Sequence, residues 1–113
     1  MHEMSLAESM LDIVETTARR HDATRVTEVR LEIGALSQVE VEALRFCFDA
    51  VTRGSVAEGA ALTIDRTPGA AWCMPCGTSV PIGQLGDACP ACGSYQLTVT
   101  GGDEMRVKDI AVA

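Results

Sequence analysis

Apolar side chains recur along the chain with two different periods, and these periods predict where helices and strands lie. A helix is expected from Ser5 to about His21, because Ser5 and Glu8 form a capping box at the start of a stretch with helical spacing. A second box, Ser37 to Glu40, is expected to open a second helix. The apolar stripes consist of Leu6, Met10, Ile13, Val14, Thr17 and Ala18 in the first helix and of Val41, Leu44, Cys47, Phe48 and Val51 in the second.

Strands are expected where apolar and polar residues alternate with a period of two. The first runs from Val26 to Ile33, and its buried face is predicted to consist of Thr27, Val29, Leu31 and Ile33. A second strand covers about residues 60–65, and alternation resumes after Tyr95. The last strand runs from about Glu104 to Val112, after a turn formed by residues 101–103.

Four of the five cysteines form two Cys-x-x-Cys pairs, Cys73 with Cys76 and Cys89 with Cys92. Each pair is followed by a glycine, which lets the backbone curl back so that both thiolates face one ion. Two such turns facing each other form a tetrahedral site that suits zinc, although two disulfides are an alternative interpretation of the spacing. A site of four thiolates leaves no open coordination position, so we expect a structural metal rather than a catalytic one.

The predicted order is helix, strand, helix, strand, cysteine ribbon, strand. Since the ribbon falls between two strands that are long enough to pair, it is expected to be an insertion. We therefore expect an α+β fold, with a small mixed sheet that carries two helices on one face, plus an inserted four-cysteine zinc ribbon. The α+β domain would be discontinuous, formed by residues 1–67 and 101–113, and residues 68–100 would form the ribbon domain.

No catalytic arrangement stands out in the sequence. Cys47 lies on the apolar stripe of the second helix and is expected to be a small buried side chain, with no histidine beside it. His21 is expected to be exposed to solvent at the basic end of the first helix. The chain has no Gly-rich phosphate loop and no nucleophile elbow, so we do not expect an enzyme.

The charge of the chain restricts its partners. The formal net charge is −7, and no Lys or Arg occurs between Arg66 and Arg106, so a nucleic-acid partner is not expected. No apolar run approaches the roughly 18 residues of a membrane helix, and acidic residues interrupt the region where a signal peptide would lie. Five cysteines, four of them in metal spacing, fit a reducing compartment, so a cytoplasmic location is expected.

The first three residues form a candidate site for a second metal. With Met1 retained, its α-amine can chelate one ion together with the amide nitrogen and the imidazole of His2. Glu3 offers a fourth donor through its amide or its carboxylate. Such nitrogen-rich, near-planar sets favour Ni(II) or Cu(II) over zinc. The alternative is an N-terminus that binds no metal, since chain ends are commonly poorly ordered.

A chain that begins Met1-His2-Glu3 and carries an amphipathic helix and a double Cys-x-x-Cys ribbon resembles the HypA/HybF family of nickel metallochaperones. The resemblance covers nearly the whole chain. Further matching pieces are Ile33-Gly34, Leu36-Ser37-x-Val39, Leu62-Thr63-Ile64 and Gly102-Asp103-Glu104-Met105.

The resemblance implies a role for each candidate residue. His2 would be the essential nickel ligand, completed by the amine of Met1, the amides of His2 and Glu3, and the Glu3 side chain, in a nickel-binding domain of residues 1–67 and 101–113. Glu40 occupies a position where some members place an acidic residue near the nickel. Structural zinc would be held by Cys73, Cys76, Cys89 and Cys92.

The resemblance also implies partners. Family members work with the nickel-handling GTPase HypB and deliver nickel to the large subunit of [NiFe]-hydrogenase, and some serve urease. We expect a monomer or a weak homodimer, because a small sheet can leave an exposed edge strand. A zinc-ribbon adaptor without a nickel role and a nucleic-acid-binding ribbon are the competing interpretations, and the missing cations of the ribbon argue against the second.

Overall fold

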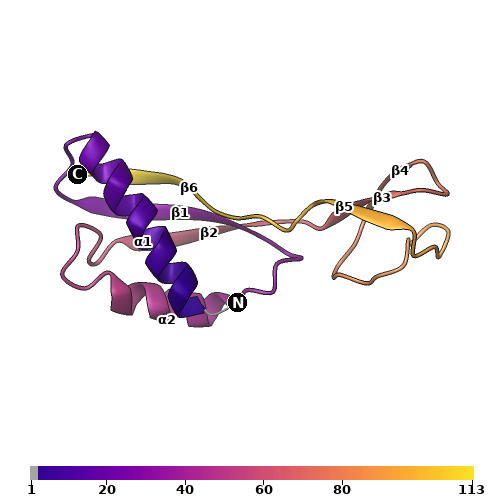
Figure 1. Ribbon diagram of the computed structural model, residues 1–113, viewed down its shortest axis with the longest axis horizontal. Helices are drawn as coiled ribbons and strands as arrows, with labels where there is room; N and C mark the ends of the chain where they lie inside the picture. Colours follow the sequence, from indigo (N-terminus) through magenta and orange to yellow (C-terminus); the bar gives the residue numbers. More distant parts are fainter. Residues whose placement is uncertain (1–2) are drawn as a thin grey trace. The chain divides into compact units, whose positions relative to one another are not determined.

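The computed structural model describes residues 3–113, so Met1 and His2 lie outside the described residues. The chain divides into two compact units. The first contains residues up to Leu31 with Val39–Asp65 and Arg106–Ala113, and the second contains Glu32–Gln38 and Arg66–Met105. The elements (Figure 1) are α1 (Glu3–Arg20), β1 (Val26–Gly34), α2 (Val41–Val51), β2 (Ala61–Thr67), β3 (Ala70–Cys73), β4 (Thr78–Pro81), β5 (Leu97–Gly101) and β6 (Met105–Val112).

The sheet of the first unit has the strand order β2-β1-β6. β1 and β6 are antiparallel, because the Ala113 N–H donates to the Arg25 carbonyl while the Thr27 hydroxyl donates to the Ala111 carbonyl. β2 is reached from β1 through α2, which is the kind of connection that parallel neighbours require. The expected mixed sheet is confirmed. The strands β2 and β6, which lie before and after the ribbon in the chain, do not pair with each other, because β1 lies between them.

The helices of the first unit pack against each other, and α1 crosses the three strands of the sheet (Figure 1). The buried stripe of α1 consists of Ala7, Met10, Val14 and Ala18, and that of α2 of Leu44 and Phe48. On β1, Val29 and Leu31 of the same unit are fully buried. None of the helices within residues 3–113 is long and apolar enough to cross a membrane.

Both predicted capping boxes are wrong. α1 begins at Glu3, so Ser5 and Glu8 lie inside its first turns. α2 begins at Val41 with Glu40 as the N-cap, and the Glu40 side chain makes no capping hydrogen bond. The Ser37 hydroxyl instead donates to the carbonyl of Gly34, at 2.7 Å, which stabilises the turn after β1. The carboxylate of Glu40 is therefore not used in a capping box.

Local hydrogen bonds explain how α1 ends and why Thr27 of β1 is exposed. Asp22 has a φ of 51°, and the N–H of Ala23 donates to the carbonyl of Ala18, which is the Schellman arrangement at a helix end. On β1, Thr27 was expected on the buried face but is exposed, and Val26 is buried instead. The Thr27 hydroxyl donates a hydrogen bond to the backbone carbonyl of Ala111 on β6.

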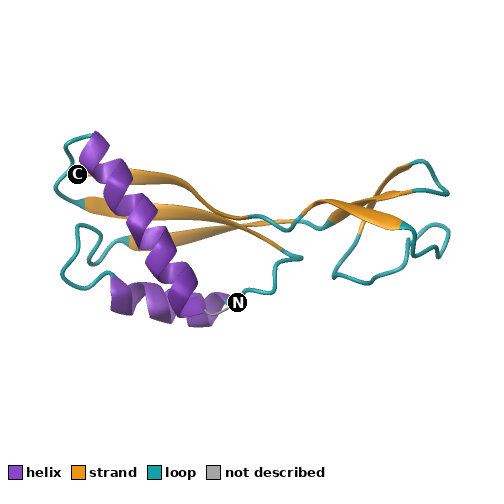
Figure 2. Cartoon of the chain, viewed as in Figure 1, coloured by secondary structure: helices purple, strands orange, loops and turns teal. Residues whose placement is uncertain are grey.

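Within residues 32–38 and 66–105, the second unit contains strands and loops but no helix (Figure 2), and its sheet has the strand order β4-β3-β5. Both pairs are antiparallel, and Trp72 of β3 lies between Ser79 and Thr98. One small core joins Leu36 to Ala71 and Ile82, with Leu97 packed against it. Residues 32–38 were expected with the first domain, but they lie in the second unit because Leu36 is buried there.

Glycines allow three backbone segments of the second unit to approach closely. A Cβ on Gly34 would overlap the carbonyl oxygen of Gly102, and Gly102 itself has a φ of 92°. The N–H of Gly34 donates to the carbonyl of Glu104 at 2.8 Å, and the N–H of Leu36 donates to the carbonyl of Gly102 at 2.6 Å. The Glu104 carboxylate accepts from the Thr67 hydroxyl, which ties the third segment to the same place.

Candidate metal centre

The four cysteines of the two Cys-x-x-Cys pairs come together in the second unit. Their Sγ atoms all lie within 4.8 Å of one another. The Sγ atoms of Cys73 and Cys92 are 3.6 Å apart, and those of Cys76 and Cys89 are 3.9 Å apart. Four thiolates at the usual zinc–sulfur distance of about 2.3 Å would form a tetrahedron with edges of about 3.8 Å. The donor set and its spacing therefore fit a four-coordinate metal ion.

The two turns that present the cysteines have the same backbone geometry. Gly77 donates its N–H to the carbonyl of Cys73, and Gly93 donates its N–H to the carbonyl of Cys89, each at 2.8 Å. The φ angles of Gly77 and Gly93 are 64° and 77°, values that residues with a Cβ rarely adopt. Glycine after each pair is therefore a geometric requirement, and it lets both thiols of a pair point to one side.

The surroundings of the cysteines differ on the two sides of the cluster. Cys73 and Cys89 are buried with Val80, and Leu97 packs against them, whereas Cys76 and Cys92 are exposed. The first cysteine of each pair thus anchors the cluster in the apolar core of the unit. The second cysteine of each pair faces solvent, from which an ion can enter.

The electrostatics of the cluster favour a bound cation when all four cysteines are thiolates. The backbone N–H of Cys92 lowers the pKa of Cys89 to about 7. Hydrogen bonds with the thiols of Cys92 and Cys73 raise the pKa of Cys76 to about 12. Four thiolates this close repel one another, so full deprotonation needs a bound metal ion that supplies positive charge. With all four sulfurs on the ion, no position is left for a catalytic water.

Of the other predicted site residues, the structure describes Glu3 and Glu40, both in the first unit. Met1 and His2 are outside the described residues, whereas Glu3 is the first residue of α1. The backbone N–H of Glu40 donates to the carboxylate of Glu3 at 3.3 Å, so the structure brings these two predicted residues together. Glu40 is exposed.

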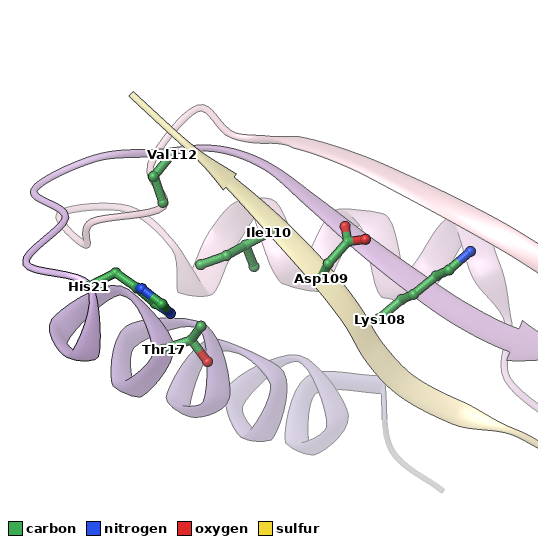
Figure 3. Close-up of a pocket in the computed structure, with 6 residues that line it drawn as sticks. All are labelled: Thr17, His21, Lys108, Asp109, Ile110 and Val112. Carbon is green, nitrogen blue, oxygen red and sulfur yellow. The ribbon is translucent and has the colours of Figure 1, made fainter.

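A pocket that the sequence pattern did not predict lies between the end of α1 and β6. Its volume is about 460 Å³, and it is lined by Thr17, His21, Lys108, Asp109, Ile110 and Val112 (Figure 3). The alternation of Ile110 and Val112 indicated a strand, but the pocket arises only when α1 packs beside that strand. His21, expected at a polar helix end, is exposed and also contributes to this pocket.

Comparison with known proteins identifies the family. The family described as "Hydrogenase/urease nickel incorporation, metallochaperone, hypA" matches residues 1–112. Two proteins named hydrogenase maturation factor HypA, from Dechloromonas aromatica and from Azoarcus sp., are each 62% identical over 112 residues; the matches cover 99% of this chain and 99% and 98% of those proteins.

A solved structure agrees with this result. The solution structure of the Ni metallochaperone HypA from Helicobacter pylori has a TM-score of 0.72 and 25% identity, over 99% of this chain and 97% of that one. A second solution structure, titled HypA protein, has a TM-score of 0.73 at 24% identity, over 100% of this chain and 97% of that one, and supports the fold. This chain belongs to the HypA family of nickel metallochaperones, which are hydrogenase maturation factors and not enzymes.

Proposed function

We propose that the chain binds one Ni(II) at its N-terminus and delivers it during the maturation of [NiFe]-hydrogenase. The ligands would be the α-amine of Met1, the amide nitrogen and imidazole of His2, and the amide nitrogen of Glu3. The start of α1 supports this assignment. The N–H groups of a helix's first turn have no acceptor within the helix, so the amide of Glu3 can ligate a metal without breaking a helical hydrogen bond.

The contact between Glu3 and Glu40 supports the proposed nickel site from outside the set of ligands. The carboxylate of Glu3 accepts from the N–H at the N-cap of α2, and this hydrogen bond fixes the start of α1 beside α2. We infer that the Glu3 carboxylate positions the chelate in this way rather than ligating nickel. The Glu40 carboxylate makes no capping bond, so it is available as a further nickel ligand.

Such a site serves to transfer nickel to an acceptor, and not to catalyse a reaction. Ligands at a chain terminus can be replaced one at a time by those of an acceptor, so moderate affinity suits a carrier. Nickel binding requires the neutral imidazole of His2 and the neutral amine of Met1. Binding is therefore expected to weaken as pH falls, because protons compete with nickel for these nitrogens and for the ligating amides.

The four-cysteine cluster is proposed to hold structural zinc. The sulfur spacing and the thiolate set fit zinc, and Cys73, Cys76, Cys89 and Cys92 would be its ligands. The second unit has only small cores, around Leu36 and around Cys73, so a metal cross-link supplies stability that these cores lack. Zinc would hold the ribbon without taking part in nickel exchange.

The proposed partners follow from the family. We infer that nickel passes between this chain, the GTPase HypB and the hydrogenase large subunit, and that urease is a second acceptor where one is present. The protein would act in the cytoplasm as a monomer or weak homodimer. Its net charge of −7 suits a partner with a basic surface and argues against nucleic acid.

The test is nickel titration of the untagged, zinc-loaded protein beside His2→Ala. One nickel per chain in the wild type and none in the variant, with zinc retained in both, is the expected result. Equal binding by the two proteins, or no binding by either, would contradict the N-terminal site and favour a zinc-ribbon adaptor. A tag at the N-terminus must be avoided because it removes the free amine.

A further inference from the structure

The outer edge of β6 is available for pairing. β6 has a strand neighbour on one side only, β1, in the part of the chain that the structure describes. The N–H of Ala113 faces β1, where it donates to Arg25, so by alternation the N–H of Val112 and that of Ile110 point to the open edge. Residues 110–112 are uncharged and β6 ends there, whereas charged residues protect the earlier part of this edge.

The pocket beside this edge is apolar in character. Ile110 and Val112 contribute aliphatic surface, and Thr17 and His21 face Ile110 from the side of α1 (Figure 3). The two charged lining residues are paired within the fold. The ammonium of Lys108 lies 3.3 Å from the Asp65 carboxylate, and the Asp109 carboxylate binds the Arg30 guanidinium at 2.6 and 2.8 Å. The pocket can therefore take an apolar group without leaving a charge unpaired.

The pocket residue His21 belongs to an arginine-rich segment of an otherwise acidic chain. The segment from Arg19 to Arg25 contains three arginines and His21, and Asp22 is its only acidic residue. Arg20 lies three residues after Thr17, so it projects from the same side of α1 as the pocket. Ile13, one turn before Thr17, is 50% exposed and extends the apolar surface along the helix.

We propose that this edge and pocket bind an extended acidic segment of a partner protein. The segment adds a strand to β6 by hydrogen bonding to the backbone of Ile110 and Val112. One of its apolar side chains fills the pocket, and its carboxylates pair with Arg20 and His21. A volume of about 460 Å³ is ample for one large side chain. This inference does not depend on the nickel site.

A second copy of this chain is a poorer occupant of the edge. Antiparallel pairing of two β6 strands about a twofold axis near Ala111 would bring the two copies of the Arg19–Arg25 segment close together. The like charges of those segments would then repel, whereas an acidic segment is attracted. The surface thus favours a partner of opposite charge over self-association.

The experiment starts with a photoreactive p-benzoylphenylalanine in place of Thr17 in the full chain, expressed in the cells from which the protein comes. The cross-linked segment is identified by mass spectrometry, synthesised as a peptide and titrated against the protein by fluorescence anisotropy. We expect a segment with net negative charge and an apolar residue at the cross-link. Arg20→Glu should weaken its binding about tenfold or more, since it places like charges together.

Control variants distinguish the loss of strand pairing or of charge attraction from misfolding. Arg53→Glu reverses an exposed charge just after α2 and should change peptide affinity by no more than about twofold. Val112→Pro removes an outward N–H and should abolish strand addition, whereas Val112→Ala should not. The proposal is overturned if the probe cross-links only to a second copy of the chain, if the cross-linked segment is basic or neutral, or if cross-linking does not exceed that of a probe at position 53. It is also overturned if Val112→Pro binds the peptide as tightly as Val112→Ala does. Nickel titration of the same variants should match the wild type.

Discussion

At the scale of single residues, Gly34 should tolerate no side chain. Its Cβ would overlap the carbonyl oxygen of Gly102, whose own backbone is held against Gly69. Gly34→Ala should therefore lower the free energy of unfolding by about 2–4 kcal/mol, the cost of forced overpacking with backbone displacement. Urea denaturation of the zinc-loaded protein measures the change.

Gly86→Ala is the matched control for this substitution. Gly86 also lies in the second unit and has a φ of 89°, but beyond its chain neighbours no atom lies within 4 Å of the place that a Cβ would occupy. Only backbone strain of about 1–2 kcal/mol is expected there. Equal losses for the two variants would show that the close approach at Gly34 contributes nothing.

Glu3 provides a second test at this scale, because a positioning carboxylate and a nickel ligand respond differently to substitution. Glu3→Gln keeps an oxygen that can accept from the N–H of Glu40, whereas Glu3→Ala does not. We expect Glu3→Ala to weaken nickel binding about 10–100-fold, as loss of supporting hydrogen bonds does at other metal sites, and Glu3→Gln to weaken it much less. Nickel titrations that give equal losses for the two variants would identify the carboxylate as a direct ligand.

Helices, strands and turns differ in how far the sequence predicts them. The cysteine turns were predictable because Cys-x-x-Cys-Gly fixes its own geometry within five residues. The capping boxes were not, since the Ser37 hydroxyl donates to the Gly34 carbonyl and the N-cap of α2 is Glu40. The position of β1 between β2 and β6 was also missed, because alternation predicts a strand but not its neighbours.

Among elements, the ion pair between Arg30 and Asp109 ties β1 to β6. The Arg30 guanidinium lowers the pKa of Asp109 below its ordinary value through two hydrogen bonds. A carboxyl group whose pKa is lower in the folded state stabilises the fold above its unfolded pKa and loses that contribution as pH falls through the folded pKa. The melting temperature of the wild type should thus exceed that of Asp109→Asn at pH 7, and the difference should vanish in acid.

Exposure limits the size of this effect. The side chains of Arg30 and Asp109 are 46% and 42% exposed, so water and salt screen the pair. A higher salt concentration at pH 7 should therefore reduce the difference in melting temperature. A difference that persists at low pH would mean that Asp109→Asn acts through packing of β6 and not through the carboxylate charge.

At the scale of the whole molecule, the two units should respond separately to loss of the metal. Both described helices (Figure 2) belong to the first unit. All four clustered cysteines belong to the second unit. Trp72, the only tryptophan of the chain, precedes Cys73 on β3 and so reports on the second unit alone. The fluorescence of Trp72 therefore reports on the second unit and the helical circular dichroism on the first, without any added label.

Chelation of zinc should change the fluorescence of Trp72 and leave the helical circular dichroism nearly unchanged. Without the ion, no positive charge offsets the repulsion between the clustered thiolates, and only the small cores around Leu36 and Cys73 are left to hold the second unit. The core of the first unit, with Val29, Leu31 and Leu44 fully buried, contains no cysteine of the cluster. Joint loss of both signals would mean that the units fold as one cooperative structure and that the metal supports the first unit as well. Loss of the fluorescence change in Trp72→Phe verifies the reporter, and restoration by added zinc shows that the change is reversible.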